Sequence, residues 1–234
     1  RGWSSPEDCN ICNGNGEDFL SSLSLQPQLY KIKTVENDLK GELNPTNTLN
    51  YIFFEKNTWI GFEDFFNYYL LQNEDKLKLL CRNNDWNKFK EGLKARLYRT
   101  QFGFLTEYHA FYVAKVIFGD ENVKRSLELD KLGIDFQIFY LNNKYNLHIF
   151  VDTERAWYYR RFKSKYKNVD KEEGIHVNLP YKLNSGFIHS LRYLPNGFGV
   201  YTEEYLKYLK DQIDLKKIKN NNIISVTKEG FTYI

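Results

Sequence analysis

Asp135, His148 and Asp152 are the residues of this chain whose types and spacing suit phosphate chemistry. They lie on or beside two apolar runs, rich in Ile, Phe, Tyr and Val, that flank a short polar triplet. The runs are residues 134–141 and 145–151, and the triplet is Asn142-Asn143-Lys144. This pattern predicts a β-hairpin with a tight polar turn. An acid at the start of one strand, facing polar groups on the next, can hold a divalent metal over a phosphate.

Each of these side chains also has a structural interpretation. Successive residues of a strand point to opposite faces, so His148, Phe150 and Asp152 share one face of the second strand. His148 is either a ligand or base near neutral pH, or a neutral histidine packed under the sheet. Asp152 supplies a second carboxylate or caps the next helix, because Asp152 and Thr153 directly precede Glu154. Taken alone, the stretch is more simply a hairpin with one charged edge residue.

Length and composition are those of a folded soluble protein. The 234 residues suffice for one large domain or two small ones, with 42% hydrophobic and 27% charged residues. A net charge of +3 is too small to indicate a polyanion partner by itself. No apolar run approaches the roughly 18–20 residues that span a bilayer, and the polar opening of the chain predicts no signal peptide. We therefore expect no contact with a membrane.

The three cysteines do not form the pattern of a disulfide scaffold, which favours a reduced, cytoplasmic location. Cys9 and Cys12, in Cys-Asn-Ile-Cys, make half of a zinc knuckle, whereas a structural zinc needs four ligands. We expect residues 1–16 to be a flexible tail or a partial zinc knuckle.

Residues 17–234 are expected to form a single domain of the α/β class with a helical N-terminal half. Helical spacing of apolar residues predicts helices at 59–72 and 86–118, with Gly103 leaving room for two helices in the longer segment. Further helices are predicted at 154–167 and 203–210, and strands at 174–181, 198–201 and 223–226. Residues 17–130 are then mainly helical, and residues 131–234 hold the catalytic sheet and the helices that contact DNA.

A basic segment follows the hairpin directly. Its cations alternate with aromatic residues, and the cations that we assign to DNA contact are Arg155, Arg160, Arg161 and Lys163. Such a mixture can follow phosphates and fill a groove. It also fits an ordinary amphipathic helix with aromatic residues inside and cations solvated. Its position after an acid-bearing hairpin favours the DNA contact.

Five segments, in order along the chain, resemble the TaqI type II restriction endonuclease family. The resemblance runs with gaps from about Tyr30 to about Tyr205. The segments are Ile32-Lys-Thr-Val-Glu-Asn-Asp-Leu39 with Glu42-Leu-Asn-Pro45, Phe89-Lys-Glu-Gly-Leu-Lys-Ala-Arg-Leu-Tyr-Arg-Thr100, Tyr108-His109, Leu132-Gly-Ile-Asp135 and Leu194-Pro-Asn-Gly-Phe198. Each segment is weak alone, and their shared order carries the resemblance.

The resemblance implies a Mg²⁺-dependent endonuclease with a mixed-sheet, restriction-endonuclease-like core of the PD-(D/E)xK kind. Such enzymes cut both strands of double-stranded DNA at a short palindrome, which is TCGA for the namesake. A homodimer does this most simply, and a cognate DNA methyltransferase accompanies it in the bacterial cytoplasm. Asp135 matches the family's metal-binding Asp, and His148 is the second expected metal ligand.

The second strand departs from the family pattern. Where the family carries Gln-Ile-Lys, with a lysine thought to be catalytic, this chain has His148-Ile149-Phe150. Phenylalanine can neither orient a water molecule nor stabilise a pentacovalent phosphate. Either the role of the lysine has moved, with His148 and Asp152 joining Asp135 as catalytic residues, or the protein no longer cuts.

The predicted long helix adds one more catalytic candidate. Many nucleases with this core place a helical carboxylate beside the metal, and Glu91 is the candidate here. Glu91 is more simply explained as an exposed partner of a neighbouring Lys or Arg. His109, on the same helix, is expected to be a core histidine.

Three functions are therefore compatible with the sequence. The first is a sequence-specific DNA endonuclease of a restriction-modification system. The second is a DNA-binding protein that kept the fold and lost cleavage, which Phe150 favours. The third is a helical interaction module whose hairpin only closes the core.

Overall fold

The computed structural model describes residues 16–35, 39–56, 58–82, 85–166, 171–183 and 189–234, with the side chains of 163–166 left out. Its internal contacts divide the chain into two compact units, Arg1–Thr106 with Pro195–Phe198 and Glu107–Leu194 with Gly199–Ile234. The expected single domain over residues 17–234 stays a prediction. The predicted tail or zinc knuckle, with Cys9 and Cys12, lies outside the described residues apart from Gly16.

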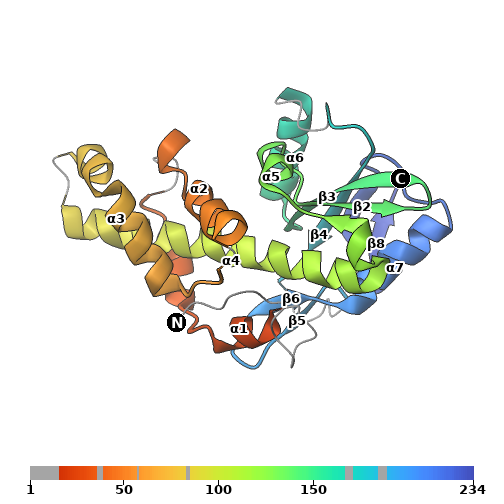
Figure 1. Cartoon of the computed structure of the whole chain (residues 1–234), viewed down its shortest axis with the longest axis horizontal. Helices are drawn as coiled ribbons and strands as arrows, with labels where there is room; N and C mark the ends of the chain where they lie inside the picture. Colours follow the sequence, from red (N-terminus) through yellow and green to blue (C-terminus); the bar gives the residue numbers. More distant parts are fainter. Residues whose placement is uncertain (1–15, 36–38, 57, 83–84, 167–170, 184–188) are drawn as a thin grey trace. The chain divides into compact units, whose positions relative to one another are not determined.

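The first unit is helical, as the spacing of its apolar residues predicts. It contains α1 (Glu17–Ser22), η2 (Pro27–Lys31), η3 (Gly41–Leu43), α2 (Pro45–Asn50), the π-helical turn η4 (Tyr51–Glu55), α3 (Phe62–Cys81) and the first part of α4 (Trp86–Phe118). The helix expected at 59–72 begins at Phe62 and continues to Cys81. Figure 1 shows α4 as one uninterrupted helix, so the alternative of two helices meeting at Gly103 is wrong.

Aromatic rings fill the core of the first unit. Trp59 is 2% exposed and packs edge-on against Phe19 and Phe53, at ring-centroid distances of 5.2 and 5.5 Å. Tyr98 of α4 packs edge-on against Phe62 of α3 at 5.0 Å. Rings in such edge-on pairs add to the free energy gained from burying their large surfaces. Much of the aromatic content of this half is therefore core.

The second unit contains a mixed four-stranded sheet in the order β1-β2-β3-β4. Its strands are β1 (Val123–Lys124), β2 (Phe136–Tyr140), β3 (Asn143–Val151) and β4 (Ile175–Tyr181). β2 is antiparallel to both β1 and β3, whereas β3 and β4 run parallel. The connection from β3 to β4 passes through α6 (Glu154–Tyr166), as parallel strands require a crossover. The α/β class, with a helical N-terminal half and a mixed sheet after it, is confirmed.

The remaining elements of the second unit lie around this sheet. They are η5 (Asp120–Asn122), α5 (Leu127–Lys131), the hairpin of β5 (Leu191–Tyr193) and β6 (Gly199–Tyr201), α7 (Glu203–Asp214), and the hairpin of β7 (Ile223–Val226) and β8 (Phe231–Tyr233). The strands predicted at 174–181 and 223–226 and the helices predicted at 154–167 and 203–210 are present. The short elements α5, β1, β5 and β8 were not predicted, because so few residues carry no clear period.

The predicted β-hairpin is present, with its turn shifted by one residue. Leu141 and Asn142 both have positive φ, at 49° and 59°, while Asn143 and Lys144 already belong to β3. Two consecutive residues with positive φ are the mark of the tight turns whose twist matches that of the two strands. The register pairs Phe136 with Leu147, which fixes every side chain of the hairpin to one face or the other.

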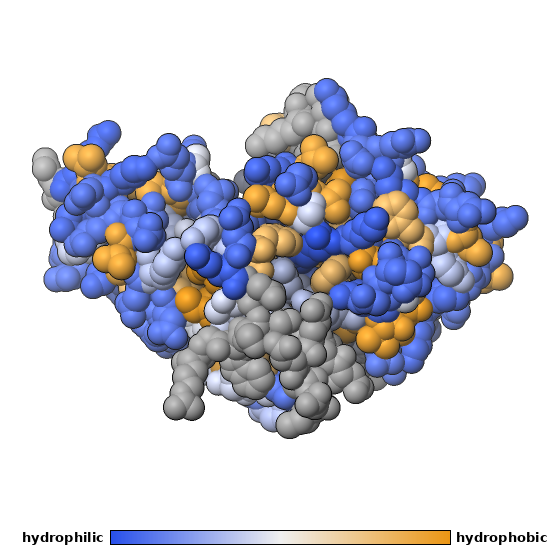
Figure 2. All heavy atoms as spheres, viewed as in Figure 1, coloured by the Kyte–Doolittle hydropathy of each residue, from blue (hydrophilic) through white to orange (hydrophobic). Residues whose placement is uncertain are grey.

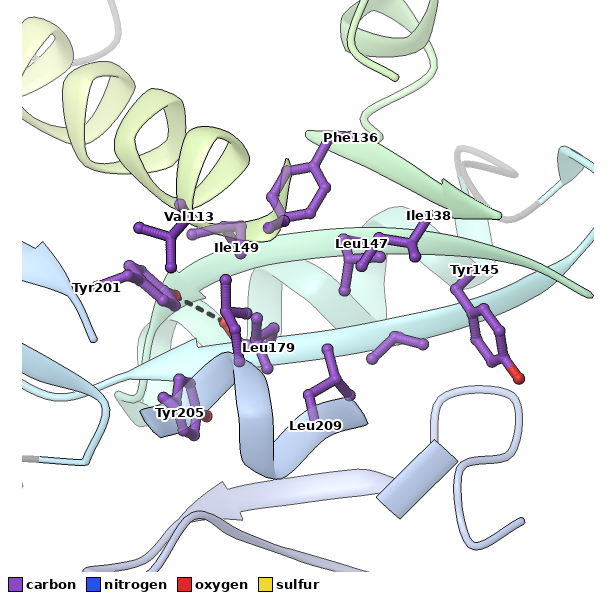
Figure 3. Packing of buried hydrophobic residues seen from close by; sticks show 14 of the residues in the cluster. Val113, Phe136, Ile138, Tyr145, Leu147, Ile149, Leu179, Tyr201, Tyr205 and Leu209 are labelled. Atoms are coloured by element: carbon purple, nitrogen blue, oxygen red, sulfur yellow. Dashed lines mark hydrogen bonds between the residues drawn. The ribbon is translucent and has the colours of Figure 1, made fainter. Parts of the chain in front are cut away.

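The two faces of the sheet differ in polarity. Tyr145, Leu147 and Ile149 of β3 belong to an apolar cluster with residues of α4 and α7, and Figure 3 shows these side chains packed together. In the same view the hydroxyl of Tyr201 donates a hydrogen bond of 3.0 Å to the carbonyl oxygen of Leu179. The opposite face of β3 carries polar side chains, and α6 packs over it.

The surface drawn in Figure 2 is mainly hydrophilic, with hydrophobic residues in small separate patches. None of the described helices combines the length and the apolar composition needed to cross a bilayer.

Two glycines of α4 provide a matched test of its packing. A Cβ atom on Gly103 meets no described atom within 4 Å, whereas one on Gly92 overlaps Thr34 Oγ1 and comes within 2.9 Å of Val35 Cγ2. Gly103→Ala therefore raises the free energy of unfolding by about 1 kcal/mol, because alanine favours helix. Gly92→Ala lowers it by about 1–2 kcal/mol, because overpacking outweighs that gain. Urea unfolding of both variants checks the opposite signs, and equal effects contradict the described approach of residues 34–35 to α4.

Candidate active site

The candidate site lies at the edge of the sheet where β2 begins and the parallel strands β3 and β4 end. Asp135, half-buried, comes immediately before β2. Its N–H donates to the carbonyl oxygen of Leu147 at 3.0 Å, and its Oδ2 accepts the N–H of Ile149. Backbone groups of β3 therefore hold both the main chain and the carboxylate of Asp135.

Glu107 is a second carboxylate that, like Asp135, acts on the buried phenols of Tyr181 and Tyr201. Burial raises the pKa of the Tyr181 phenol, and the carboxylates of Glu107 and Asp135 raise it further. Burial likewise raises the pKa of Tyr201, with neighbouring phenols and then Asp135 and Glu107 adding to the effect. The rings of Tyr181 and Tyr201 contact each other at 5.6 Å. Both phenols are thus protonated at neutral pH and act as neutral neighbours of two anionic groups.

Arg125 supplies positive charge beside Glu107. Its Nη2 atom is 3.9 Å from Oε2 of Glu107, and its side chain is 1% exposed. The guanidinium lies over the ring of Tyr108 at 4.4 Å. The sequence analysis missed both Glu107 and Arg125. For Glu107 the available signal was its position directly before Tyr108-His109, which belongs to the resemblance.

His148 lies inside the protein, in a column of buried polar groups. It is 3% exposed, and its Nδ1 is 2.8 Å from the carbonyl oxygen of Gly133. Its Nε2 is 2.9 Å from Nδ1 of His176, whose Nε2 is 2.9 Å from the carbonyl oxygen of Glu172. Both ring nitrogens of His148 thus face protein atoms at hydrogen-bonding distance. These contacts favour the packed, structural interpretation of His148, and its role as a metal ligand or base stays a prediction.

Phe150, at the position where the resemblance predicts a lysine, lies on the polar face of β3. Its ring packs edge-on against Trp157 of α6 at a centroid distance of 4.8 Å. Phe150 shares the α6-facing side of β3 with Asn146 and His148, as strand alternation predicts. Phe150 therefore makes an aromatic contact between β3 and α6, and the correspondence with a lysine stays a prediction.

Asp152 is a structural carboxylate. Its side chain is 8% exposed and accepts hydrogen bonds from Trp157 Nε1 at 2.7 Å and from the Val226 N–H at 3.0 Å. The hydroxyl of Ser225 and the ammonium of Lys182 lie at 3.2 and 3.6 Å. Donors from α6, from β7 and from Lys182 just after β4 surround this carboxylate, which favours a structural role, and its catalytic role stays a prediction. The capping alternative is wrong.

The cap of α6 comes instead from the next residue. Oγ1 of Thr153 accepts the N–H of Ala156 at 3.2 Å, which satisfies one of the unpaired donors at the start of the helix.

The cations assigned to DNA contact separate into two groups on α6. Arg155 and Arg161 are exposed, on the same helix as the exposed rings of Tyr158 and Tyr159. Arg160 is buried and donates from Nε to Oδ1 of Asn178 at 2.9 Å and from Nη2 to Oδ1 of Asn221 at 3.2 Å. Arg160 therefore joins α6 to the sheet and is unavailable to DNA. The side chain of Lys163 lies outside the described residues.

The two candidates on α4 behave as ordinary helical residues. Glu91 is exposed, within the first unit, and its catalytic role stays a prediction. His109 is fully buried, which confirms that it is a core histidine.

Asp135 and Glu107 fit a Mg²⁺ ion by the chemistry of their donors. Within the described part of the chain, clusters of three or more His, Cys, Asp or Glu suited to a metal do not occur. Mg²⁺ is nevertheless usually held by one or two carboxylates, with water and substrate phosphate completing its six ligands. Asp135 at the edge of the sheet and Glu107 on α4, which both act on Tyr181 and Tyr201, are donors of that kind.

Comparison with known proteins gives a consistent result. The family model described as TaqI restriction endonuclease matches residues 14–187. The type II restriction enzyme TaqI of Thermus aquaticus is 30% identical over 228 residues, which cover 83% of this chain and 85% of that enzyme. The type II restriction enzyme TthHB8I of Thermus thermophilus is 30% identical over 230 residues, with the same shares covered. No solved structure matches the chain.

Replacement of the Asp152 carboxylate tests its structural role. Asp152→Ala lowers the free energy of unfolding by about 3 kcal/mol, because it leaves Trp157 Nε1 and the Val226 N–H without their buried acceptor. The control is Glu154→Ala, an exposed acid two residues on, with an expected change within about 0.5 kcal/mol. Denaturant unfolding measures both, and equal values for the two variants contradict the structural role.

Proposed function

The chain belongs to the TaqI restriction endonuclease family, and we propose that it is a site-specific endonuclease that hydrolyses double-stranded DNA with Mg²⁺. A short palindrome such as TCGA is the proposed site. The main support within the chain is Asp135, which is half-buried and whose carboxylate is held by the Ile149 N–H at the edge of the sheet. The segment Leu132-Gly-Ile-Asp135 is also where this chain resembles the metal-binding part of the family.

Phosphodiester hydrolysis needs negative charge to be neutralised and a water molecule to be positioned in line with the leaving oxygen. A bound Mg²⁺ supplies a Lewis acid for the phosphate and lowers the pKa of a coordinated water. In our proposal Asp135 and Glu107 hold this ion. Asp135 needs no reorganisation to do so, because backbone groups of β3 already fix its carboxylate.

Arg125 takes over part of the electrostatic role of the missing lysine. It lies beside Glu107 and is almost fully buried, so its charge acts in a medium of low dielectric constant. A guanidinium does not release its proton in proteins. Arg125 can therefore offset the charge of the carboxylates, but it does not accept a proton from the attacking water.

A second candidate function is a DNA-binding protein of the same fold that no longer cleaves. Phe150 favours it, because its ring packs on Trp157 where a catalytic lysine is expected. The two functions share the DNA partner and differ in whether the phosphodiester bond is broken. A cleavage assay separates them directly.

The exposed side of α6 is the proposed DNA-contacting surface. It presents Arg155, Arg161 and the aromatic rings of Tyr158, Tyr159 and Phe162, which are 60%, 49% and 38% exposed. Arginine contacts to phosphate set the register of a protein on DNA, and aromatic rings can fill a groove beside them. Arg160 is left out, because it is buried against Asn178.

The proposed partners follow from the cutting of a palindrome. A two-fold dimer presents one active site to each strand. A cognate methyltransferase protects the host sites from cleavage, and both enzymes then act on DNA in the bacterial cytoplasm.

Cleavage of a plasmid containing TCGA tests the proposal. The wild-type protein with Mg²⁺ gives discrete fragments, and chelation of the metal with EDTA stops the reaction. Asp135→Asn lowers the cleavage rate by at least about 10³-fold, because the amide is a poor metal ligand. DNA that is retarded on a gel yet stays intact with wild-type protein supports the second candidate instead.

Two glutamates of α4 form a matched pair in the same assay. Glu107→Gln lowers the rate by about 10²-fold or more, whereas Glu91→Gln, on the exposed surface, leaves it within about two-fold. A larger loss of rate in Glu91→Gln than in Glu107→Gln would show that Glu91 is the catalytic carboxylate of the helix.

The salt dependence of DNA binding tests the α6 surface. Arg155→Ala and Arg161→Ala each reduce the slope of log K against log salt concentration by about 1, because each removes one phosphate contact. Lys207→Ala is the control, since Lys207 is an exposed cation of α7 paired with Glu203 at 2.8 Å, and the slope is unchanged. Fluorescence anisotropy with a labelled duplex, in Ca²⁺ to prevent cleavage, gives the slopes. Equal slopes for all three variants exclude α6 as the contact surface.

A further inference from the structure

The two buried histidines lie directly behind the turn that carries Asp135. His148 and His176 are 3% and 2% exposed and come from the adjacent parallel strands β3 and β4. Their rings are nearly coplanar, with 15° between the planes, and Nε2 of His148 is 2.9 Å from Nδ1 of His176. A single chain of contacts thus runs from the carbonyl oxygen of Gly133 to that of Glu172.

The partners at the two ends of this chain decide where its protons lie. Carbonyl oxygens only accept hydrogen bonds, so Nδ1 of His148 and Nε2 of His176 are the donors at the ends. The remaining contact, between Nε2 of His148 and Nδ1 of His176, is a hydrogen bond when one of the two nitrogens carries a proton. Glu172, with Lys144 at 2.8 Å, and Arg160, held by Asn178 next to His148 in the sheet register, are the charged groups nearest in the network.

The amide of Asn146 has a fixed orientation beside this pair. Its Oδ1 accepts from Nε2 of Gln137 at 2.8 Å, so its Nδ2 donates to the carbonyl oxygen of Glu173 at 3.2 Å. Partners on β2 and just before β4 therefore hold this amide in place.

The pair controls the main chain just before Asp135. Gly133 has a φ of 74°, a conformation that most other residues adopt only with strain, and its carbonyl oxygen accepts the Nδ1–H of His148. Two residues later the carboxylate of Asp135 accepts the N–H of Ile149, the residue next to His148. Consecutive residues of β3 therefore hold the turn and the carboxylate, one by its side chain and the other by its backbone.

We propose that His148 and His176 are positioning residues, which act through Gly133 to hold the carboxylate of Asp135 in its working place. The proposal rests on the nuclease function proposed above for its catalytic consequence. It gives His148 a role other than metal ligand or base. His176 acts one step further back, because its Nδ1 holds the ring of His148 against Gly133.

The contact between His176 and Nε2 of His148 indicates which replacement of His176 is conservative. The amide nitrogen of asparagine sits near the position of Nδ1, so His176→Asn keeps a donor for Nε2 of His148. His176→Leu has a similar volume and removes that donor. The two variants therefore differ mainly in whether the ring of His148 stays in place.

Amide NMR reads the position of the carboxylate independently of cleavage. Ile149 gives a downfield amide resonance while Asp135 accepts its N–H, and Asp135→Ala shows where that resonance moves when the carboxylate is absent. We expect His176→Asn to keep the wild-type resonance and His176→Leu to move it at least halfway to the Asp135→Ala position. In the plasmid assay His176→Leu lowers kcat by about 30-fold with little change in KM, and His176→Asn stays within about three-fold of wild type.

Several outcomes overturn the proposal. A wild-type Ile149 resonance in folded His176→Leu, or equal effects of the Leu and Asn variants, shows that the histidines only pack. If His176→Leu does not fold, ¹⁵N-histidine spectra of the wild-type protein decide. Exchange-protected ring protons on both histidines support the pair, and their absence overturns it. If His176→Leu shifts the Ile149 resonance as expected but the wild-type protein does not cut DNA, the proposed nuclease function is wrong and the positioning role still holds.

Discussion

Strand β3 is paired along both edges, antiparallel to β2 and parallel to β4, and the rest of the second unit depends on this double pairing. A strand in such a position is normally apolar on both faces, because helices cover both. Here Leu147 and Ile149 are buried in the apolar cluster under α4 and α7, while Asn146 and His148 are buried under α6. One face of β3 gains stability from the hydrophobic effect, and the other depends on complete hydrogen bonding.

The polar face accounts for the precision of the site. A buried polar group left without a partner costs about 1–3 kcal/mol, so the chain of contacts through Asn146, His148 and His176 strongly favours one register. A shift of β2 by a single residue would turn Gln137 away from Asn146. The same shift would remove Asp135 from the Ile149 N–H. The register that satisfies the buried hydrogen bonds is therefore the same register that places the carboxylate of Asp135.

Sequence periodicity predicted the elements well, because periodicity is local. The helix α4 and the strand β3 follow from the spacing of their own residues, and Asp135 follows from its place before a strand. The roles of Asp152 and Arg160 depended on partners more than 15 residues away, Val226 and Asn178 among them. Nothing in the types of these residues separates a solvent-exposed charge from one that joins a helix to a sheet.

The choice between the two glutamates of α4 shows the same limit. Glu91 and Glu107 are separated by 16 residues, which is about 24 Å along a helix. Which of them acts on the same residues as Asp135 depends on where the helix packs against the sheet. Glu107 does so, because it and Asp135 both raise the pKa of Tyr181 and of Tyr201. Helical spacing alone carries no information on that meeting point.

Phe150 also joins three elements at the end of β3. Its ring packs on Trp157, which donates to Asp152, so the end of β3 is a packed joint with α6 and β7. Positive charge beside Glu107 then comes from Arg125. Arg125 and the two histidines are unsuited to accept a proton from water, because a guanidinium keeps its own and the histidine nitrogens face partners within the column. In a cleaving enzyme of this design, the proton of the attacking water must leave to solvent or to a phosphate oxygen of the substrate.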